Sequence, residues 1–209
     1  MNIEVVKPMD IEKRSFEIIS ELLGDKKLDE KNAHIIKRVI HTSADFEYAD
    51  NLCFSENASQ ILADAIKNGA DIVTDTQMAK AGINKTTLAK FGGEVHCFIA
   101  DGDVAMEARM KGVTRSSICM EKALNINKPL IFAIGNAPTA LIRLAELIKE
   151  GKIKPALIIG VPVGFVNVVE SKEITMENEI PYIVARGRKG GSNVAAAICN
   201  AAMYTLIER

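Results

Sequence analysis

Residues 128–140 read KPLIFAIGNAPTA, and this stretch decides the fold. The continuous apolar run at 129–134 is typical of a strand that is buried on both faces of a parallel sheet. Gly135 then opens a turn, and Pro138 suits the first turn of the helix that the following residues predict as far as Glu150. The stretch therefore predicts one strand–turn–helix unit of an α/β protein.

Similar units are found on both sides of this stretch. Further strands are predicted at 71–73, 94–99, 155–159 and 181–185, and helices at 10–23, from a cap at Asp29 to Ile40, and from a cap at Ser55 over 56–68. The pattern indicates an α/β fold with a doubly wound, mostly parallel five-stranded sheet and helices on both faces, in three layers. Residues 1–50 predict a helical layer, and no Pro- or Ser-rich linker follows it, so we expect one domain over residues 1–209.

The composition argues against several classes of function. The chain has 209 residues, with 26 basic and 27 acidic side chains, and a charge this close to balance disfavours a nucleic-acid or anionic membrane surface. Trp is absent and aromatic residues make up 5%, which disfavours a stacking platform for single-stranded nucleic acid. The amino terminus lacks the apolar run of a secretory signal, and the apolar segment at 193–206 is too short to span a bilayer. We therefore expect a cytoplasmic protein without nucleic-acid or membrane partners.

The four cysteines, Cys53, Cys97, Cys119 and Cys199, are widely spaced along the chain. None of them forms a C-x-x-C pair, so the sequence supports neither a zinc site nor a thioredoxin-like redox motif. We expect reduced, mostly buried thiols and no bound metal.

Three unusual turns follow predicted strands: GNAPTA at 135–140, GVPVGF at 160–165 and RGRKGGSN at 186–193. Ligands of open α/β sheets bind outside the carboxyl ends of the strands, where these turns are expected to lie. Their glycines allow a close backbone approach, and the helix that begins after RGRKGGSN can receive an anion at its amino terminus. The turns match neither a P-loop nor a dinucleotide-binding motif.

His41 is the most informative ionisable residue. It stands where a helical pattern runs into polar turn residues, and a histidine at the carboxyl end of a helix is favoured as a cation that can serve as a general acid. A simple capping role fits the same position. We interpret His34, on the same helical stripe, as a packing or surface residue and His96, in a strand pattern, as a core or edge residue.

Three segments contain basic residues and no acidic ones: 31–44, 108–120 and 180–207. Their bases include Arg38, Arg115 and Arg188. Together the segments predict that positive charge converges on a ligand with several negative groups, and arginine forks suit carboxylates or phosphates.

Six motifs, in order, resemble those of the precorrin-8X methylmutases, also called cobalt-precorrin-8 methylmutases. They are RVIHTSAD (38–45), TDTQMAKAGI (74–83), TRSSICM (114–120), GNAPTAL (135–141), IIGVPVGFVNVVESKE (158–173) and RGRKGGSNVAAAICNA (186–201). The resemblance covers nearly the whole chain. It departs from the family at residues 42–43, where members commonly have Ala-Thr, while His41 itself matches.

The resemblance implies an isomerase of vitamin B12 biosynthesis that moves a methyl group from C11 to C12 of precorrin-8 or cobalt-precorrin-8, giving hydrogenobyrinate or cobyrinate. It implies no cofactor and a homodimer of α/β subunits with flavodoxin-like topology. The histidine of the family's R-x-x-H motif, here His41, would be the proton donor and acceptor. Substrate-binding positions carry over to Ser15, Arg38 and Arg115, although the local pattern around Ser15 is that of an ordinary helix serine.

A tetrapyrrole substrate agrees with the residues. A late intermediate carries many carboxylates on its rim, which dispersed arginines and helix amino termini can hold. Its macrocycle needs an apolar floor, for which the sequence offers Met78, Met106, Val161, Pro162, Val163 and Phe165.

Three other functions fit the sequence less well. A corrinoid carrier would ligate cobalt through D-x-H-x-x-G, but none of the three histidines is followed by glycine at that spacing. Without the resemblance, a transferase that uses RGRKGGSN as a phosphate loop would be the leading hypothesis, and the intact His41 weighs against a non-catalytic assembly subunit. For the methylmutase, both full proton transfer and hydrogen bonding by His41 fit the sequence, as do substrates with and without cobalt.

Overall fold

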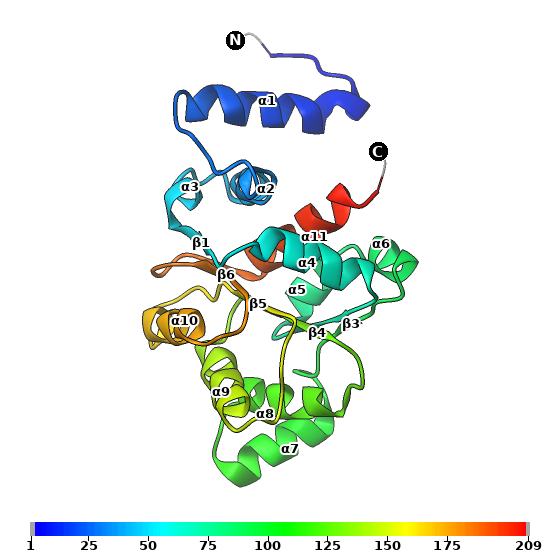
Figure 1. Ribbon diagram of the computed structural model, residues 1–209, viewed down its shortest axis with the longest axis vertical. Coiled ribbons are helices and arrows are strands. Elements are labelled where there is room, and N and C mark those ends of the chain that lie inside the picture. Colours follow the sequence, from blue (N-terminus) through cyan, green and yellow to red (C-terminus); the bar gives the residue numbers. More distant parts are fainter. Residues whose placement is uncertain (1–2, 208–209) are drawn as a thin grey trace.

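A computed structural model describes residues 3–207 of the chain. A six-stranded sheet forms the middle layer, with the strand order β1-β6-β5-β4-β2-β3 (Figure 1). The strands are β1 (Leu52–Phe54), β2 (Asp71–Thr74), β3 (Val95–His96), β4 (Leu130–Ile134), β5 (Leu157–Gly160) and β6 (Tyr182–Ala185).

The five predicted strands are all present and run parallel to one another, with Ile72 of β2 beside Val95 on one side and Ile131 on the other. Their order, β3-β2-β4-β5-β6, is the flavodoxin order, which reverses between β2 and β4. The doubly wound prediction is therefore confirmed, but the count of five strands is one too few. Strand β1 pairs antiparallel with β6, and its three residues are too few to show a periodic pattern.

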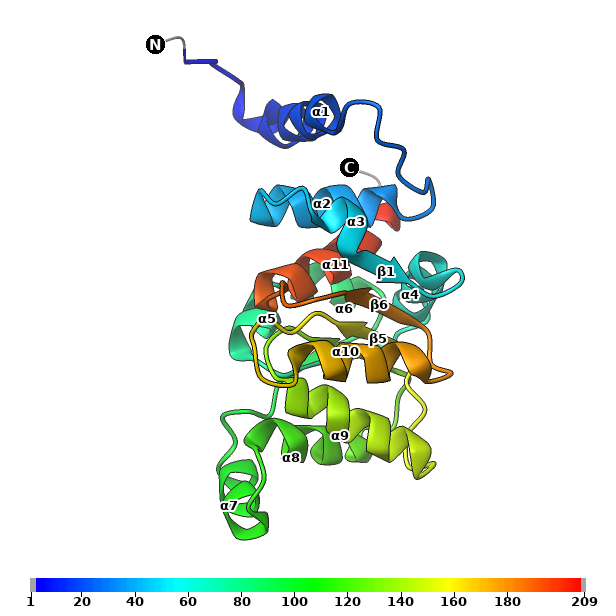
Figure 2. The ribbon, with the colours of Figure 1, turned by 90° about the vertical axis from the view of Figure 1, so that its left-hand side faces the viewer.

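Helices cover both faces of the sheet (Figure 2). One face carries α2 (Ala33–Ser43), α4 (Ala58–Lys67), α6 (Lys85–Lys90) and α11 (Ser192–Thr205), with α5 (Gln77–Gly82) against α11. The other face carries α7 (Gly102–Lys111), α8 (Arg115–Lys122) and α9 (Pro138–Lys149), with α10 (Val168–Glu177) beside α9. Because neighbouring strand residues alternate between the faces, Ile131 joins the first core and Phe132 the second.

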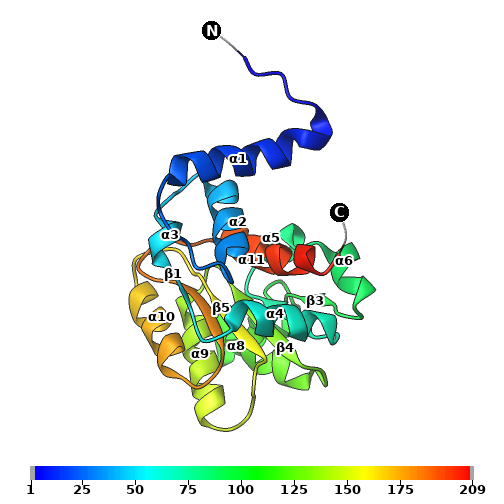
Figure 3. The same ribbon diagram turned by 45° about the horizontal axis from the view of Figure 1, so that its top comes forward.

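Helix α1 (Ile11–Leu23) lies outside α2 and forms the outer helical layer that residues 1–50 predict (Figure 3). A 3-10 turn at Pro8–Asp10 precedes α1, and further short turns of helix lie at α3 (Tyr48–Asn51) and, in 3-10 form, at Ala123–Asn125. Gly24 ends α1 with a positive φ of 55°, as its position after the apolar pattern predicts.

Helix α11 is packed in the core between the sheet and α2. Its alanines, including Ala195 and Ala197, are buried and small enough to let neighbouring backbones approach closely. One such approach is at Gly82, where an added Cβ would lie 2.9 Å from the Cβ of Ala196. The small-residue segment therefore serves packing within one chain.

Several predicted boundaries are wrong. Helix α2 begins after Asn32 rather than Asp29, and α4 begins after Asn57 rather than Ser55, whose hydroxyl accepts a hydrogen bond from the Tyr182 amide at 2.9 Å. The strand predicted at 94–99 shrinks to β3, an edge strand. There, His96 Nε2 lies 2.8 Å from an Asp71 carboxylate oxygen, so its interpretation as an edge residue is confirmed.

The cysteines behave as predicted: Cys97, Cys119 and Cys199 are buried, Cys53 is half-buried, and all four are free thiols. Within residues 3–207, no helix has the length and apolar character that crossing a bilayer requires.

Candidate functional site

The conspicuous motifs meet at the carboxyl edge of the sheet. Strands β2, β4, β5 and β6 all end at this edge. Each is followed by a turn that belongs to one of the six motifs, namely those at 74–83, 135–141, 158–173 and 186–201. In a doubly wound sheet the ligand crevice lies at this edge, beside the point where the strand order reverses. The reversal is between β2 and β4, so the turns after these two strands define the site.

Asp75 ties these two turns together. Its carboxylate is buried, with the residue 1% exposed, and accepts backbone hydrogen bonds from Gly135 (2.9 Å), Asn136 (2.8 Å) and Ala137 (2.6 Å). Burial raises the pKa of Asp75, and the three amide donors oppose that shift. Since Ala137 directly precedes α9, the carboxylate also lies at a helix amino terminus, where negative charge is favoured.

Close backbone contacts join the remaining turns to this centre. A Cβ on Gly135 would lie 2.7 Å from the Cα of Ser192, and one on Gly190 would lie 2.1 Å from the carbonyl oxygen of Val161. The hydroxyls of Thr76 and Ser192 lie 2.7 Å apart. The turns after β2, β4, β5 and β6 therefore form one packed unit that fixes the start of α11.

His41 lies in the last turn of α2, beside this unit. It is exposed and lines a cavity of about 260 Å³ together with Arg38, Asn193, Asn200 and Tyr204, among others. Its ring stacks on Phe16 of α1, with centroids 5.4 Å apart and an angle of 17° between the planes. The helix ends at Ala44, which adopts a positive φ of 55°, so His41 is next to the negative end of the helix dipole.

Arg38 is one turn before His41 and contacts α1 and α11. Its side chain is 16% exposed, its guanidinium lies 4.7 Å from the Phe16 ring centre and 5.2 Å from that of Tyr204, and it forms an ion pair with Glu12. Arg38 and Tyr204 also line a second hollow of about 560 Å³. Arg38 thus holds α1 onto the body and stands between two hollows.

Ser15 precedes Phe16 on α1. Its hydroxyl donates to the Ile11 carbonyl at 2.8 Å, which is an ordinary contact within a helix. Phe16 contacts both His41 and Arg38, so these two of the four predicted residues meet at one α1–α2 corner, and Ser15 is the helix neighbour of the Phe16 that joins them.

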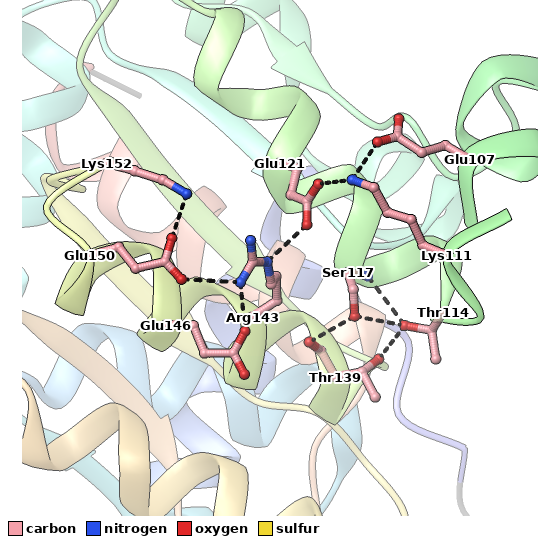
Figure 4. A network of polar contacts seen from close by, with 10 residues as sticks. All are labelled: Glu107, Lys111, Thr114, Ser117, Glu121, Thr139, Arg143, Glu146, Glu150 and Lys152. Carbon is pink, nitrogen blue, oxygen red and sulfur yellow. Dashed lines mark hydrogen bonds and ion pairs between the residues drawn. The ribbon is translucent and has the colours of Figure 1, made fainter. Parts of the chain in front are cut away.

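Arg115 is not brought to this corner within the chain. It begins α8, which packs on the opposite face of the sheet, and its side chain is exposed. The start of α8 is nevertheless rigid, because the Thr114 hydroxyl lies 2.8 Å from that of Thr139 and 3.0 Å from that of Ser117 (Figure 4). These hydrogen bonds therefore fix the backbone from which the Arg115 side chain extends, on the far side of the sheet.

Two lysines of the segments that lack acidic residues are paired with acids from elsewhere in the fold. Lys189 pairs with Asp45 at 2.6 Å and with Glu47 at 3.0 Å, and Lys111 pairs with Glu121 at 2.8 Å. The predicted convergence of positive charge is thus wrong for these side chains, because spacing along the chain does not give proximity in space.

Only some of the residues predicted to form an apolar floor under the macrocycle are exposed at the carboxyl edge of the sheet. Val161 is buried in the core and Met106 lies on α7, on the face opposite His41. Met78, Val163 and Phe165 are exposed in segments that follow strand ends, and Phe165 is 81% exposed.

Two residues that position the site were not singled out from the sequence. Asp75 follows a buried strand directly, a position where a polar side chain signals a site at the sheet edge. Lys172 gives no such signal, since it reads as an ordinary lysine of a helix, yet it is fully buried in α10. Across residues 3–207, no group of three His, Cys, Asp or Glu side chains is arranged to hold a metal ion.

Comparison with known proteins returns one consistent group of relatives. Residues 10–205 match the family model described as precorrin-8X methylmutase. The chain is 47% identical over 196 residues to the cobalt-precorrin-8 methylmutase of Priestia megaterium, covering 94% of this chain and 87% of that protein. It is 46% identical over 210 residues to that of Salmonella typhimurium, covering 98% of each. Among solved structures, the precorrin-8x methyl mutase of Thermus thermophilus has a TM-score of 0.86 at 38% identity, covering 94% of this chain and 95% of that one.

Replacing Asp75 by Asn tests the role of the buried carboxylate. The change puts an amide group where three backbone donors need acceptors, so we expect the free energy of unfolding to fall by about 2–4 kcal/mol. Urea unfolding measures this, with Asp64→Asn on the exposed face of α4 as the matched control. A D75N variant as stable as the control would show that the carboxylate does not hold the turns together.

Proposed function

This chain belongs to the precorrin-8X methylmutase family, isomerases that carry out an intramolecular methyl migration in corrin biosynthesis, and from that premise we propose that His41 is the proton donor for the migration. The observation that carries the proposal is the position of His41. It is an exposed imidazole at the carboxyl end of a helix, at the mouth of a cavity next to the packed turns.

In the proposed mechanism, protonated His41 donates to the ring-C end of the conjugated system of precorrin-8 or its cobalt form. The bond from the methyl group to C11 breaks as the bond to C12 forms, and the proton then returns to the imidazole. The step is an isomerisation, so no co-reactant is consumed.

The rim of the macrocycle is held by charge-assisted hydrogen bonds. We propose that Arg38 binds one rim carboxylate, which replaces Glu12 as the partner of the guanidinium, and that the Ser15 hydroxyl binds the same side of the substrate. The rings of Phe16 and Tyr204 fix the plane of the Arg38 guanidinium, so its two donor edges are oriented before the substrate arrives.

We infer that the enzyme is a homodimer in which Arg115 serves the site of the partner subunit. Its position on the opposite face of the sheet supports this, because Arg115 and His41 of one chain do not face the same cavity. The chain also exposes apolar side chains that a second copy would cover, among them Ile3 and Val5 of the amino-terminal arm and Met110 of α7. The four free thiols suit a reducing compartment, which supports our inference that the enzyme is cytoplasmic.

Replacing His41 by Asn tests the role of the imidazole. We expect turnover of precorrin-8 or its cobalt form, followed by the visible spectrum, to fall by roughly 10²–10⁴-fold, since the variant lacks a proton donor of suitable acidity. Product binding should change little, because the rim contacts remain. His34→Asn on the same helix is the control and should keep wild-type turnover. Full activity of H41N would exclude this role.

Mixing two inactive variants tests the shared site. If each site takes His41 from one subunit and Arg115 from the other, then co-refolded H41A and R115A chains form a mixed dimer with one intact site. A random mixture should then regain about a quarter of wild-type activity. Size-exclusion chromatography of the same mixture checks that the chains are dimeric. No recovery from a mixture that contains mixed dimers would place both residues of a site in one subunit.

A further inference from the structure

Lys172 is a fully buried cation that the proposed mechanism does not use. The residue is 0% exposed, and its ammonium group donates to the carbonyl oxygens of Gly187 at 2.7 Å and Lys189 at 2.8 Å. Burial lowers the pKa of the ammonium to about 8. A buried charge is costly, so its retention at the centre of a helix indicates that it satisfies groups that need it.

Both acceptors belong to loop 186–191, which connects β6 to α11. The same loop is bound at other points: the Gly164 amide donates to the Arg188 carbonyl at 3.2 Å, and the Gly191 amide donates to the Val161 carbonyl at 2.9 Å. The loop thus lies between α10 and the turn that follows β5.

This loop is connected to the surroundings of His41 at two points. The Lys189 side chain pairs with Asp45, two residues after the end of α2, and the loop leads into α11, whose Asn193 lines the His41 cavity. Arg188 extends from the same loop to the carbonyl of Phe165, an exposed residue of the neighbouring turn. The shape of the loop therefore decides where Arg188 and the first turn of α11 lie relative to His41.

We propose that Lys172 is a positioning residue that holds loop 186–191 in the shape with which Arg188 and the start of α11 meet the rim carboxylates of the corrinoid. This rests on the proposed function, and it assigns Lys172 to substrate binding rather than to proton transfer. A side chain without donors would leave the carbonyl oxygens of Gly187 and Lys189 without the donor that joins them to α10, and the loop would open to water to satisfy them.

Limited proteolysis tests whether Lys172 holds the loop, without any substrate. The loop contains three trypsin sites, Arg186, Arg188 and Lys189. In Lys172→Met, which keeps the side-chain volume but removes the donors, we expect native-state cleavage at these sites, located by mass spectrometry, to be about 10-fold faster than in wild type.

Lys149→Met, on the exposed face of α9, is the matched control and should match wild type in this loop. Lys172→Gln retains an amide donor and keeps the test usable if the Met variant does not fold. We expect its loop cleavage to lie between those of wild type and K172M. Wild-type cleavage rates in either Lys172 variant would overturn the proposal.

Kinetics on the same variants test the link to the substrate. A positioning role predicts that K172M raises KM and the product Kd by about 10-fold while kcat stays within about 3-fold of wild type. A fall in kcat with unchanged KM would overturn it. If wild-type protein neither binds nor converts the corrinoid, the proposed function fails, whereas the proteolysis result still decides whether Lys172 holds the loop.

Discussion

The buried carboxylate of Asp75 is the interaction on which the site depends. It lies where the strand order reverses, and its three hydrogen bonds fix the backbone of residues 135–137. That backbone packs directly against Ser192, since there is no room for a side chain at Gly135. The start of α11, and with it one wall of the His41 cavity, is therefore set by a carboxyl group that is itself out of reach of solvent.

Two buried side chains, the Asp75 carboxyl and the Lys172 amine, hold separate turns in place at the carboxyl edge. Asp75 fixes the turn after β4 through backbone amides, and Lys172 fixes the loop after β6 through backbone carbonyls. Among the described residues neither side chain forms an ion pair, and the partners of both are backbone groups.

The sequence predicts those features that depend on local pattern. The five buried parallel strands follow from apolar runs such as 130–134, and the position of His41 at a helix end follows from the change to polar residues after it. It does not predict features that depend on partners distant in the chain. Strand β1 is recognisable only by its pairing with β6, Lys172 is buried only because a loop closes over it, and Lys189 is neutralised by Asp45 across 144 positions. Arg115 matches a family motif, yet only the fold shows that it starts on the opposite face from His41.

A crystal structure of the protein with bound product, hydrogenobyrinate or cobyrinate, tests the central claim most directly. The account predicts that the ring-C edge of the macrocycle lies within about 3.5 Å of an imidazole nitrogen of His41, with rim carboxylates on Arg38 and near loop 186–191. A macrocycle bound instead in the polar hollow lined by Asp29, Asn57 and Gln60, at the other end of α2, would contradict it.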